Sequence, residues 1–410
     1  MPGACRFCGA PLAHVFADLG ATPLSNRFLT AADLSRMEPH YPLTVYVCGR
    51  CLLVQLEEFE PPSAIFTSDY AYFSSFSASW LDHCKRYAKE MIPRLKLGPE
   101  SLVMEIASND GYLLQYFRAA GVPVLGIEPA SNVAEAARCA GIPTEIAFFD
   151  AELASSLAER GTKADLLIGN NVLAHVPDVN GFVAGLSVAL KDAGTITMEF
   201  PHVFRLMEKN QFDTIYHEHF SYFSLAAVTR IFSAHGLTIF DVEELPTHGG
   251  SLRIYARHAA DESRPVSERV ARILAMEKEA GLDRVETYAA FGPRVAAVKR
   301  GLLKFLIAAK EEGKRVVGYG APAKGNTLLN YCGVGPDLLE YTADLSPHKQ
   351  GRYLPGARIP VVPPERILKD RPDMVLILAW NLADEICSQM AAVRGWGGRF
   401  FAPIPWIREV

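Results

Sequence analysis

The sequence predicts an α/β protein built from a small cysteine-stapled N-terminal domain and two Rossmann-like units, the second smaller than the first. Three observations predict this arrangement. Two Cys-x-x-Cys pairs fall within the first 51 residues, short apolar strands alternate with helix-length stretches from residue 102 onward, and this alternation restarts near residue 315. Such alternation is typical of parallel sheets covered by helices.

The chain has 410 residues, which is too many for one typical hydrophobic core. We therefore expect three domains, over residues 1–69, 70–285 and 286–410. The second boundary has low precision, because it falls in a long helical stretch (262–312) whose helices can belong to either neighbour.

Composition narrows the class of function. The chain carries 41 basic and 46 acidic residues, so it lacks the positive excess of a general nucleic-acid binder. Its apolar runs, such as 374–380, are much shorter than the roughly 20 residues that cross a bilayer. No apolar signal core follows Met1. We expect a cytoplasmic protein that acts on small molecules and binds neither nucleic acid nor membrane.

The paired cysteines predict a zinc site. Cys5 and Cys8 form one knuckle and Cys48 and Cys51 the other, and two such turns can close a tetrahedron of sulfur around zinc. A site with four sulfur ligands has no open position, so its role would be structural. The alternative is four unrelated core cysteines. We expect the other cysteines to be buried thiols: Cys84, Cys139, Cys332 and Cys387.

The middle of the chain predicts a parallel sheet. A strand over 43–47 feeds the second knuckle, and apolar residues recur at helical spacing over 79–95 before Gly98-Pro99 interrupts them. Further strands are predicted at 102–106, 124–127, 166–168 and 195–200. The second unit repeats the pattern, with strands predicted at 315–320, 339–343, 374–378 and 399–402.

Three features predict an adenosine-containing cofactor in the first unit. The segment from Glu105 to Gly111 is a strand followed by a glycine turn, where a ligand can approach the backbone. Glu128 ends the next strand, where a carboxylate can accept hydrogen bonds from both ribose hydroxyls of NAD or S-adenosylmethionine. The polar loop 169–178, together with the absence of a G-x-G-x-x-G turn, favours S-adenosylmethionine. The predicted cofactor ligands are Glu105, Ala107, Asn109, Gly111, Glu128, Asn170 and Asn171.

The segment Tyr216-His217-Glu218-His219 is the predicted chemical centre. Its histidines lack the i,i+4 spacing of helical zinc proteases, whereas imidazole suits general acid–base work because its pKa lies near neutrality. The alternative is that these residues only pack. We interpret three other histidines as structural, although the loop that contains the last could touch a ligand: His202, His235 and His248.

The second unit predicts an anion site. Residues 318–326 follow a strand and open a helix, so backbone amides, the helix N-terminus and Lys324 together favour phosphate. The segment is not a Walker A loop, and NAD binding stays an alternative. A second polar loop (344–351), which contains Ser346, lies at the end of the next strand on the same sheet edge.

These motifs together resemble the class I methyltransferases. They are more closely similar to the zinc-containing sugar C-methyltransferases that act at C3 of nucleotide-linked 4-keto-6-deoxyhexoses in deoxysugar and antibiotic biosynthesis. The resemblance spans nearly the whole chain, through the cysteine knuckles and the segments 69–75, 107–111, 170–178, 216–222 and 318–326.

The resemblance implies methyl transfer from S-adenosylmethionine to C3 through an enolate. It makes His219 the base that removes the C3 proton. Tyr216, Glu218, His175 and Tyr70 would position the sugar or stabilise the enolate. The second unit would bind a nucleoside diphosphate, expected to be thymidine diphosphate. The implied substrate-binding residues are Tyr222, Lys324, Asn326 and Ser346.

Two other functions stay open at the level of the sequence. One is an NAD-dependent nucleotide-sugar oxidoreductase that uses the second glycine turn, and the other is a zinc-ribbon binding protein with degenerate α/β domains. The nucleotide base, the deoxysugar, the C3 substituent, the stereochemical outcome, the oligomeric state and the pathway do not follow from the sequence.

Overall fold

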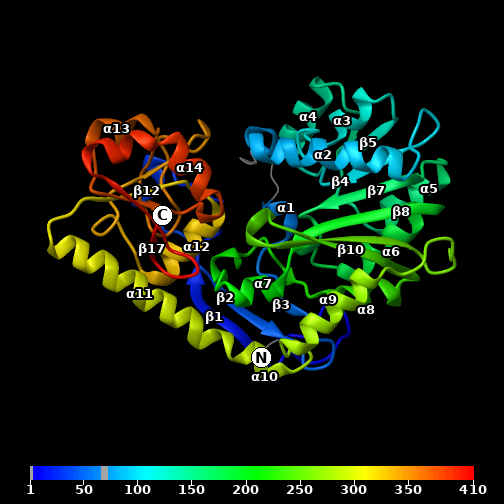
Figure 1. The fold of residues 1–410 in the computed structure, drawn as a ribbon, viewed down its shortest axis with the longest axis horizontal. Helices are drawn as coiled ribbons and strands as arrows, with labels where there is room; N and C mark the ends of the chain where they lie inside the picture. Colours follow the sequence, from blue (N-terminus) through cyan, green and yellow to red (C-terminus); the bar gives the residue numbers. More distant parts are fainter. Residues whose placement is uncertain (1–2, 66–72) are drawn as a thin grey trace.

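The computed structural model describes residues 3–65 and 73–410, whose strands form three sheets (Figure 1). The two α/β units lie side by side, with the N-terminal strands between them at their base. The predicted α/β class is confirmed. Tyr70 and the boundary predicted at residue 69 lie outside the described residues.

The N-terminal domain is built on a four-stranded antiparallel sheet with the order β1-β2-β3-β9. Its last strand comes from far along the chain, because Tyr222 pairs with Val54 and Ser221 with Gln55. The sheet therefore fixes the segment that directly follows His219. Its strands are β1 (His14–Thr22), β2 (Tyr41–Val47), β3 (Val54–Leu56) and β9 (Ser221–Tyr222), and the short helices are η1 (Ala31–Ser35), α1 (Pro62–Ile65) and η2 (Ser74–Phe76).

The four predicted zinc ligands come together, with all their sulfur atoms within 4.8 Å of one another. The sulfurs of Cys5 and Cys51, and those of Cys8 and Cys48, lie 3.5 Å apart. Tetrahedral zinc with Zn–S bonds of about 2.3 Å needs sulfur separations of about 3.8 Å, so the cluster fits zinc. Gln55 Nε2 lies 3.1 Å from the Cys5 sulfur and can donate a hydrogen bond to a thiolate there.

The other cysteines follow the prediction with one exception. Cys84, Cys332 and Cys387 are buried, but Cys139 is exposed, so the prediction for Cys139 was wrong. It is the last residue of α4 (Ser131–Cys139), whose buried face is formed by Val133, Ala134 and Ala137. Position 139 does not belong to that face.

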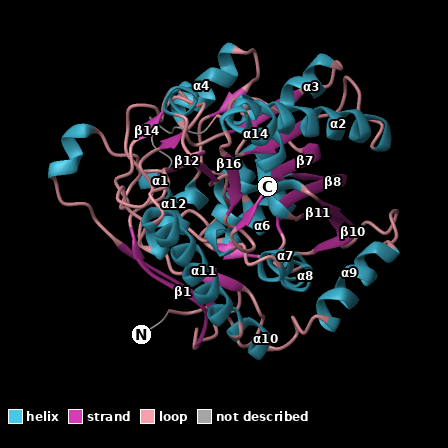
Figure 2. Cartoon of the chain, turned by 60° about the vertical axis from the view of Figure 1, so that its left-hand side comes forward, coloured by secondary structure: helices cyan, strands magenta, loops and turns pink. Residues whose placement is uncertain are grey.

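The central sheet has seven strands in the order β10-β11-β8-β7-β4-β5-β6. Strands β4 to β8 run parallel, as predicted for all of them except β6, whereas β11 lies antiparallel between β8 and β10. Figure 2 shows β7, β8, β11 and β10 in succession. The predicted strands did not include β1, β3 and β9 of the N-terminal sheet or β6, β10 and β11 of the central sheet. The seven strands are β4 (Val103–Ile106), β5 (Val124–Ile127), β6 (Thr144–Glu145), β7 (Ala164–Asn170), β8 (Leu190–Pro201), β10 (Leu237–Leu245) and β11 (Ser251–His258).

Helix α2 (Ala78–Arg94) confirms the predicted helix over 79–95. The side chain of Ser77 caps it by accepting a hydrogen bond from the Trp80 amide, and its buried face includes Tyr87 and Met91. The other helices of this unit are α3 (Leu114–Ala119), α4 (Ser131–Cys139), α5 (Ala151–Glu159), η3 (Leu173–His175), α6 (Val179–Ala189), α7 (Val203–Glu208), η4 (Phe212–Thr214), α8 (Leu225–Ala234), η5 (Thr247–Gly249) and α9 (Glu268–Glu279).

The helical stretch predicted over 262–312 consists of α9, α10 (Val285–Ala289) and α11 (Phe291–Glu311). The first break lies at Gly281, whose positive φ of 81° ends a right-handed helix. Helices α10 and α11 both pack on β1. Helix α9, in contrast, packs on β10. The boundary predicted at residue 285 coincides with the first residue of α10 and stays a prediction.

The C-terminal unit has a six-stranded sheet in the order β14-β13-β12-β15-β16-β17, parallel except for β17. Its first strand-to-glycine junction lies between β12 and α12, as predicted. The elements are β12 (Val316–Tyr319), α12 (Ala323–Cys332), β13 (Thr342–Ala343), β14 (Val361–Val362), α13 (Glu365–Asp370), β15 (Met374–Ile377), η6 (Trp380–Leu382), α14 (Ala383–Gln389), η7 (Ala391–Trp396), β16 (Arg399–Ala402) and β17 (Arg408–Glu409).

The N-terminal domain packs against both larger units. Phe16 and Leu43 share one hydrophobic core with Phe291 and Leu328 of the C-terminal part. The zinc-ligand cysteines share a second core with the central sheet. No helix of the described residues is long and apolar enough to span a bilayer.

We predict one zinc ion per chain on the four clustered sulfurs. The double substitution Cys48→Ala and Cys51→Ala should abolish zinc binding and destabilise the N-terminal domain, because two ligands cannot complete the tetrahedron. Elemental analysis of the purified protein measures this. Cys139→Ala, which removes an exposed thiol outside the cluster, is the control and should keep full zinc content. Full zinc content in the double variant would contradict the assignment.

Candidate active site

A cavity of about 590 Å³ lies among the three units. Its wall includes Asn26 from the N-terminal domain, Glu128 and His219 from the central unit, and Lys324 and Lys349 from the C-terminal unit. Most of the predicted site residues line it: Ala107, Asn109, Glu128, Asn170, Asn171, His175, Tyr216, Glu218, His219 and Lys324. Sequence segments separated by hundreds of residues therefore build one site.

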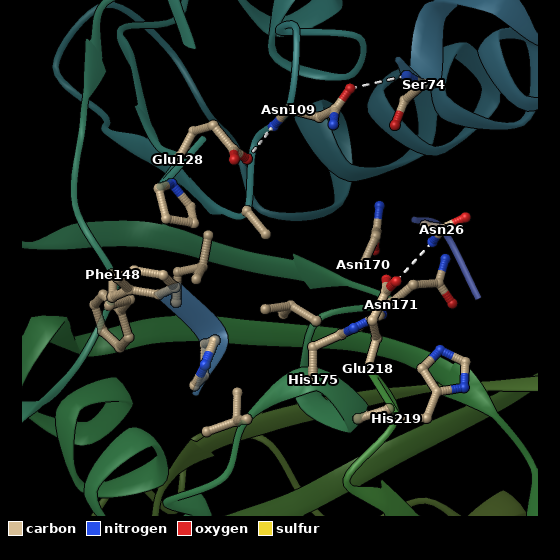
Figure 3. Close-up of a pocket in the computed structure, with 18 of the residues that line it drawn as sticks. Asn26, Ser74, Asn109, Glu128, Phe148, Asn170, Asn171, His175, Glu218 and His219 are labelled. Carbon is tan, nitrogen blue, oxygen red and sulfur yellow. Dashed lines mark hydrogen bonds between the residues drawn. The ribbon is translucent and has the colours of Figure 1, made fainter. Parts of the chain in front are cut away.

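The turn after β4 has a backbone conformation that L-residues rarely adopt. Ala107 and Asn109 have φ values of 55° and 48°, in the left-handed region. Glu128 stabilises this turn, because its carboxylate accepts hydrogen bonds from the amides of Asn109 (3.0 Å) and Ala130 (2.8 Å). Figure 3 shows Glu128 and Asn109 together at one end of the cavity. Glu128 therefore supports the loop and also faces the ligand space.

Two predicted cofactor residues do not line the cavity. Glu105 is fully buried, and burial raises the pKa of its carboxyl well above the usual range. Gly111 has a φ of 79°, and a Cβ there would meet Ile142 at 2.8 Å. Both residues therefore support the conformation of the loop without lining the cavity.

Sequence reasoning missed the wall that faces Glu128. Residues 147–150 line the cavity there, and Phe148 is 43% exposed. They follow β6, the next strand along the sheet edge. Glu128 was selected because it lies at the end of a parallel strand, and the same criterion could have found these residues. A carboxylate that can hold a ribose beside an aromatic ring suits adenosine. The site therefore fits the nucleoside half of S-adenosylmethionine.

The loop after β7 lies between the end of the cavity that contains Glu128 and the end that contains His219 (Figure 3). Asn171 has a φ of 54°, and its Nδ2 lies 3.2 Å from Nε2 of His248. His248 lines the cavity, so its interpretation as a structural residue was incomplete. The Trp80 ring contacts His248 with ring centroids 5.5 Å apart, which brings α2 to the same wall.

The hydrogen bonds of His219 define its tautomer. Nδ1 lies 2.8 Å from the carbonyl oxygen of Thr214, which can only accept, so Nδ1 carries the proton. Nε2 therefore carries the lone pair, which accepts a hydrogen bond from the Tyr216 hydroxyl at 2.8 Å. Burial lowers the pKa of His219 well below its usual value, which keeps the ring neutral. A neutral imidazole with an oriented lone pair can accept a proton from carbon.

Two more titratable groups adjoin this base. The His175 ring packs against His219 with centroids 4.7 Å apart, and burial lowers the pKa of His175 to about 4. Burial raises the pKa of the Glu218 carboxyl to about 7. His217 points elsewhere, because its Nε2 lies 3.2 Å from the carbonyl oxygen of Pro42. Only one histidine of the 216–219 segment therefore serves the cavity.

Lys324 provides a buried positive charge on the C-terminal wall. Its Nζ donates to Asn381 Oδ1 at 2.7 Å and lies 4.7 Å from the centre of the Trp380 ring. The Trp380 indole donates to the buried carboxylate of Asp213 at 2.5 Å. Burial lowers the pKa of Lys324, and the Asp213 carboxylate raises it by a smaller amount. The pKa of Lys324 therefore lies below its usual value.

Three predicted substrate residues are not among the described residues of the cavity wall. Tyr222 belongs to β9, where it pairs with Val54. Asn326 is buried in α12, and Ser346 lies on the loop from which Lys349 reaches the cavity instead. In each case the motif lies close to the site, but a neighbouring residue faces the ligand space.

Comparison with known proteins supports a transferase. Residues 5–66 match a zinc-binding domain family, residues 80–242 a methyltransferase domain family, and residues 246–405 the C-methyltransferase C-terminal domain family. The C-methyltransferase NovU of Streptomyces niveus is 39% identical, and the match covers 99% of this chain and 96% of that protein.

More distant relatives match a smaller share of the chain. A ubiquinone biosynthesis O-methyltransferase of Bartonella quintana is 27% identical over 23% of this chain and 38% of its own length. A solved magnesium protoporphyrin IX methyltransferase from Synechocystis, with bound S-adenosylmethionine, is 16% identical at a TM-score of 0.32, over 43% of this chain and 80% of that chain.

The full-length match leaves the oxidoreductase and zinc-ribbon alternatives without support. It agrees with the clustered cysteines and with the adenosine-fitting end of the cavity, and the predicted zinc and S-adenosylmethionine are confirmed. The chain therefore belongs to the family of zinc-binding, S-adenosylmethionine-dependent C-methyltransferases.

Proposed function

We propose that this C-methyltransferase methylates C3 of a nucleotide-linked 4-keto-6-deoxy sugar, with His219 as the base. The observation that carries the proposal is the neutral His219 imidazole, whose Nε2 lone pair is oriented on the wall of a cavity that also contains the cofactor loop. The substrate class rests on the resemblance of segments 216–222 and 318–326 to sugar C-methyltransferases.

The base works on a carbon acid. A proton on C3 is acidified by the adjacent C4 ketone. When the Tyr216 hydroxyl releases the Nε2 lone pair of His219, Nε2 can take this proton while the electron pair moves onto the C4 oxygen. The Thr214 carbonyl on Nδ1 stabilises the resulting imidazolium. The Tyr216 hydroxyl, which no longer bonds to Nε2, can then donate a hydrogen bond to the enolate oxygen. His175 lies beside His219. When bound, S-adenosylmethionine supplies the sulfonium methyl group that C3 accepts.

The C-terminal wall suits the nucleotide part of the substrate. Lys324 at the start of α12 and Lys349 both line the cavity and bring positive charge toward a diphosphate. We extend the proposal to thymidine diphosphate as the carrier and to deoxysugar and antibiotic biosynthesis in the cytoplasm as the setting. Tyr70 stays a predicted sugar contact in the part of the chain that the structure does not describe.

Cofactor affinity should depend on Glu128. Glu128→Ala removes charge-assisted hydrogen bonds worth roughly 1.5–3 kcal/mol, so S-adenosylmethionine should bind at least about tenfold more weakly in calorimetry. Glu145→Ala, which removes another strand-end carboxylate outside the cavity wall, should leave affinity unchanged. Unchanged affinity in Glu128→Ala would refute the assignment.

Nucleotide affinity should depend on Lys324. Lys324→Ala should raise the Kd for thymidine diphosphate several-fold, while that for S-adenosylhomocysteine stays within about twofold, because only the former carries phosphate. Lys299→Ala is the matched control, since Lys299 donates to a carbonyl and lies over a tyrosine ring away from the cavity. Equal losses for both ligands would indicate damaged folding or a misplaced site.

The base assignment makes the sharpest prediction. His219→Ala should lower turnover by about 10²–10⁴-fold while both ligands still bind, because general-base catalysis contributes that much. With S-adenosylhomocysteine in deuterated water, the wild type should exchange the C3 proton of the 4-keto sugar, and His219→Ala should not.

Two variants serve as comparisons in this exchange assay. His217→Ala removes a buried histidine of the same segment that points to Pro42, so it should retain exchange. Glu218→Gln should slow exchange less than His219→Ala. Wild-type exchange in His219→Ala would move the base to Glu218 or His175.

A further inference from the structure

We propose that Asn26 of the zinc-binding domain is a positioning residue of the active site, which holds the Glu218 carboxylate at the cavity wall. The inference rests on the proposed function only in giving Glu218 a part in the reaction. The zinc-binding domain would then contribute a side chain to the active site, in addition to its structural role.

The contact is a single, well-defined hydrogen bond. Asn26 Nδ2 donates to Glu218 Oε1 at 2.7 Å, and both side chains line the cavity (Figure 3). Glu218 is only 3% exposed. Among the residues that the structure describes, Asn26 is the one hydrogen-bond donor to this carboxylate. A buried carboxylate with one donor takes its orientation from that donor.

The backbone next to Asn26 is held by the C-terminal unit. The carbonyl oxygen of the preceding residue, Ser25, accepts a hydrogen bond of 2.5 Å from Nδ2 of Asn326 in α12. Ser25 and Asn326 are both buried. The same helix begins with Ala323 and Lys324 on the cavity wall. The Ser25-Asn26 pair therefore connects the C-terminal unit to Glu218, and this explains why Asn326 belongs to the motif without facing the ligand space.

The contact also affects the charge of Glu218. Burial raises the pKa of this carboxyl to about 7, and the hydrogen bond from Asn26 opposes the rise. The other titratable groups that share this wall are Tyr216, His175 and His219, with Lys324 on the C-terminal wall. Loss of the Asn26 donor should therefore raise the pKa further and leave a larger protonated fraction at neutral pH.

The test measures the protonation of Glu218 without turnover. Infrared difference spectra of the full-length protein, recorded across pH, report the protonated carboxyl band, and the band that Glu218→Gln removes belongs to Glu218. Asn26→Ala should move its midpoint upward by about one to two pH units, the value of one hydrogen bond to a charged group. Asn26→Asp, which replaces the donor with a second carboxylate, should raise the midpoint at least as much.

Asn180→Ala is the matched control. Asn180 also fixes the zinc-binding domain to the central unit, through hydrogen bonds from Nδ2 to the carbonyl oxygens of Arg6 (3.1 Å) and Phe7 (3.0 Å), but it does not line the cavity. Its removal should leave the Glu218 midpoint unchanged. Zinc content and the melting temperature, measured for every variant, identify any that fail to fold.

An unchanged midpoint in folded Asn26→Ala and Asn26→Asp would overturn the proposal. An equal shift in Asn180→Ala would do the same, because it would trace the effect to general loosening of the domain. The infrared result does not require the proposed sugar to be the substrate. Failure of C3 exchange with a normal Asn26-dependent shift would therefore count against the proposed function and leave this inference standing.

Discussion

The pairing of β9 with β3 is the interaction on which the site depends. Ser221 and Tyr222 extend the N-terminal sheet, and the Leu56 amide donates to the Phe220 carbonyl oxygen. On the other side, the Thr327 hydroxyl donates to the carbonyl oxygen of Ile215 at 2.8 Å. The segment that carries Glu218 and His219 is thus held at both ends, by the zinc-stapled sheet and by α12. His219, the proposed base, must be held within a fraction of an ångström of the proton that it removes, and this backbone anchoring supplies the rigidity.

Burial gives the acids and bases of the cavity their working states. Removal from water disfavours any charged form, so it lowers the pKa values of His175 and His219 and raises that of Glu218. The histidines are therefore neutral near pH 7, and Glu218 is balanced between its two forms. Hydrogen bonds then refine this state locally, through Thr214 on His219 and Asn26 on Glu218.

The cofactor end uses backbone conformation in place of a glycine-rich turn. Ala107 and Asn109 adopt left-handed conformations that cost energy, and the Glu128 carboxylate offsets that cost by accepting the Asn109 amide. Glu128 therefore both stabilises the loop and lines the cavity. In the proposed assignment, this double role lets a loop with one glycine serve where dinucleotide-binding turns carry three.

The sequence by itself determined the parallel strands, the zinc ligands and most of the cavity wall, because these depend on local patterns: apolar runs, paired cysteines, and polar residues that follow a strand. Only the tertiary structure decided that Tyr222 pairs in a sheet, that Asn326 holds Ser25, and that Asn26 reaches Glu218. Asn26 and Glu218 are separated by 192 positions. No local pattern encodes such a contact, since it arises only when parts of three units pack around one cavity.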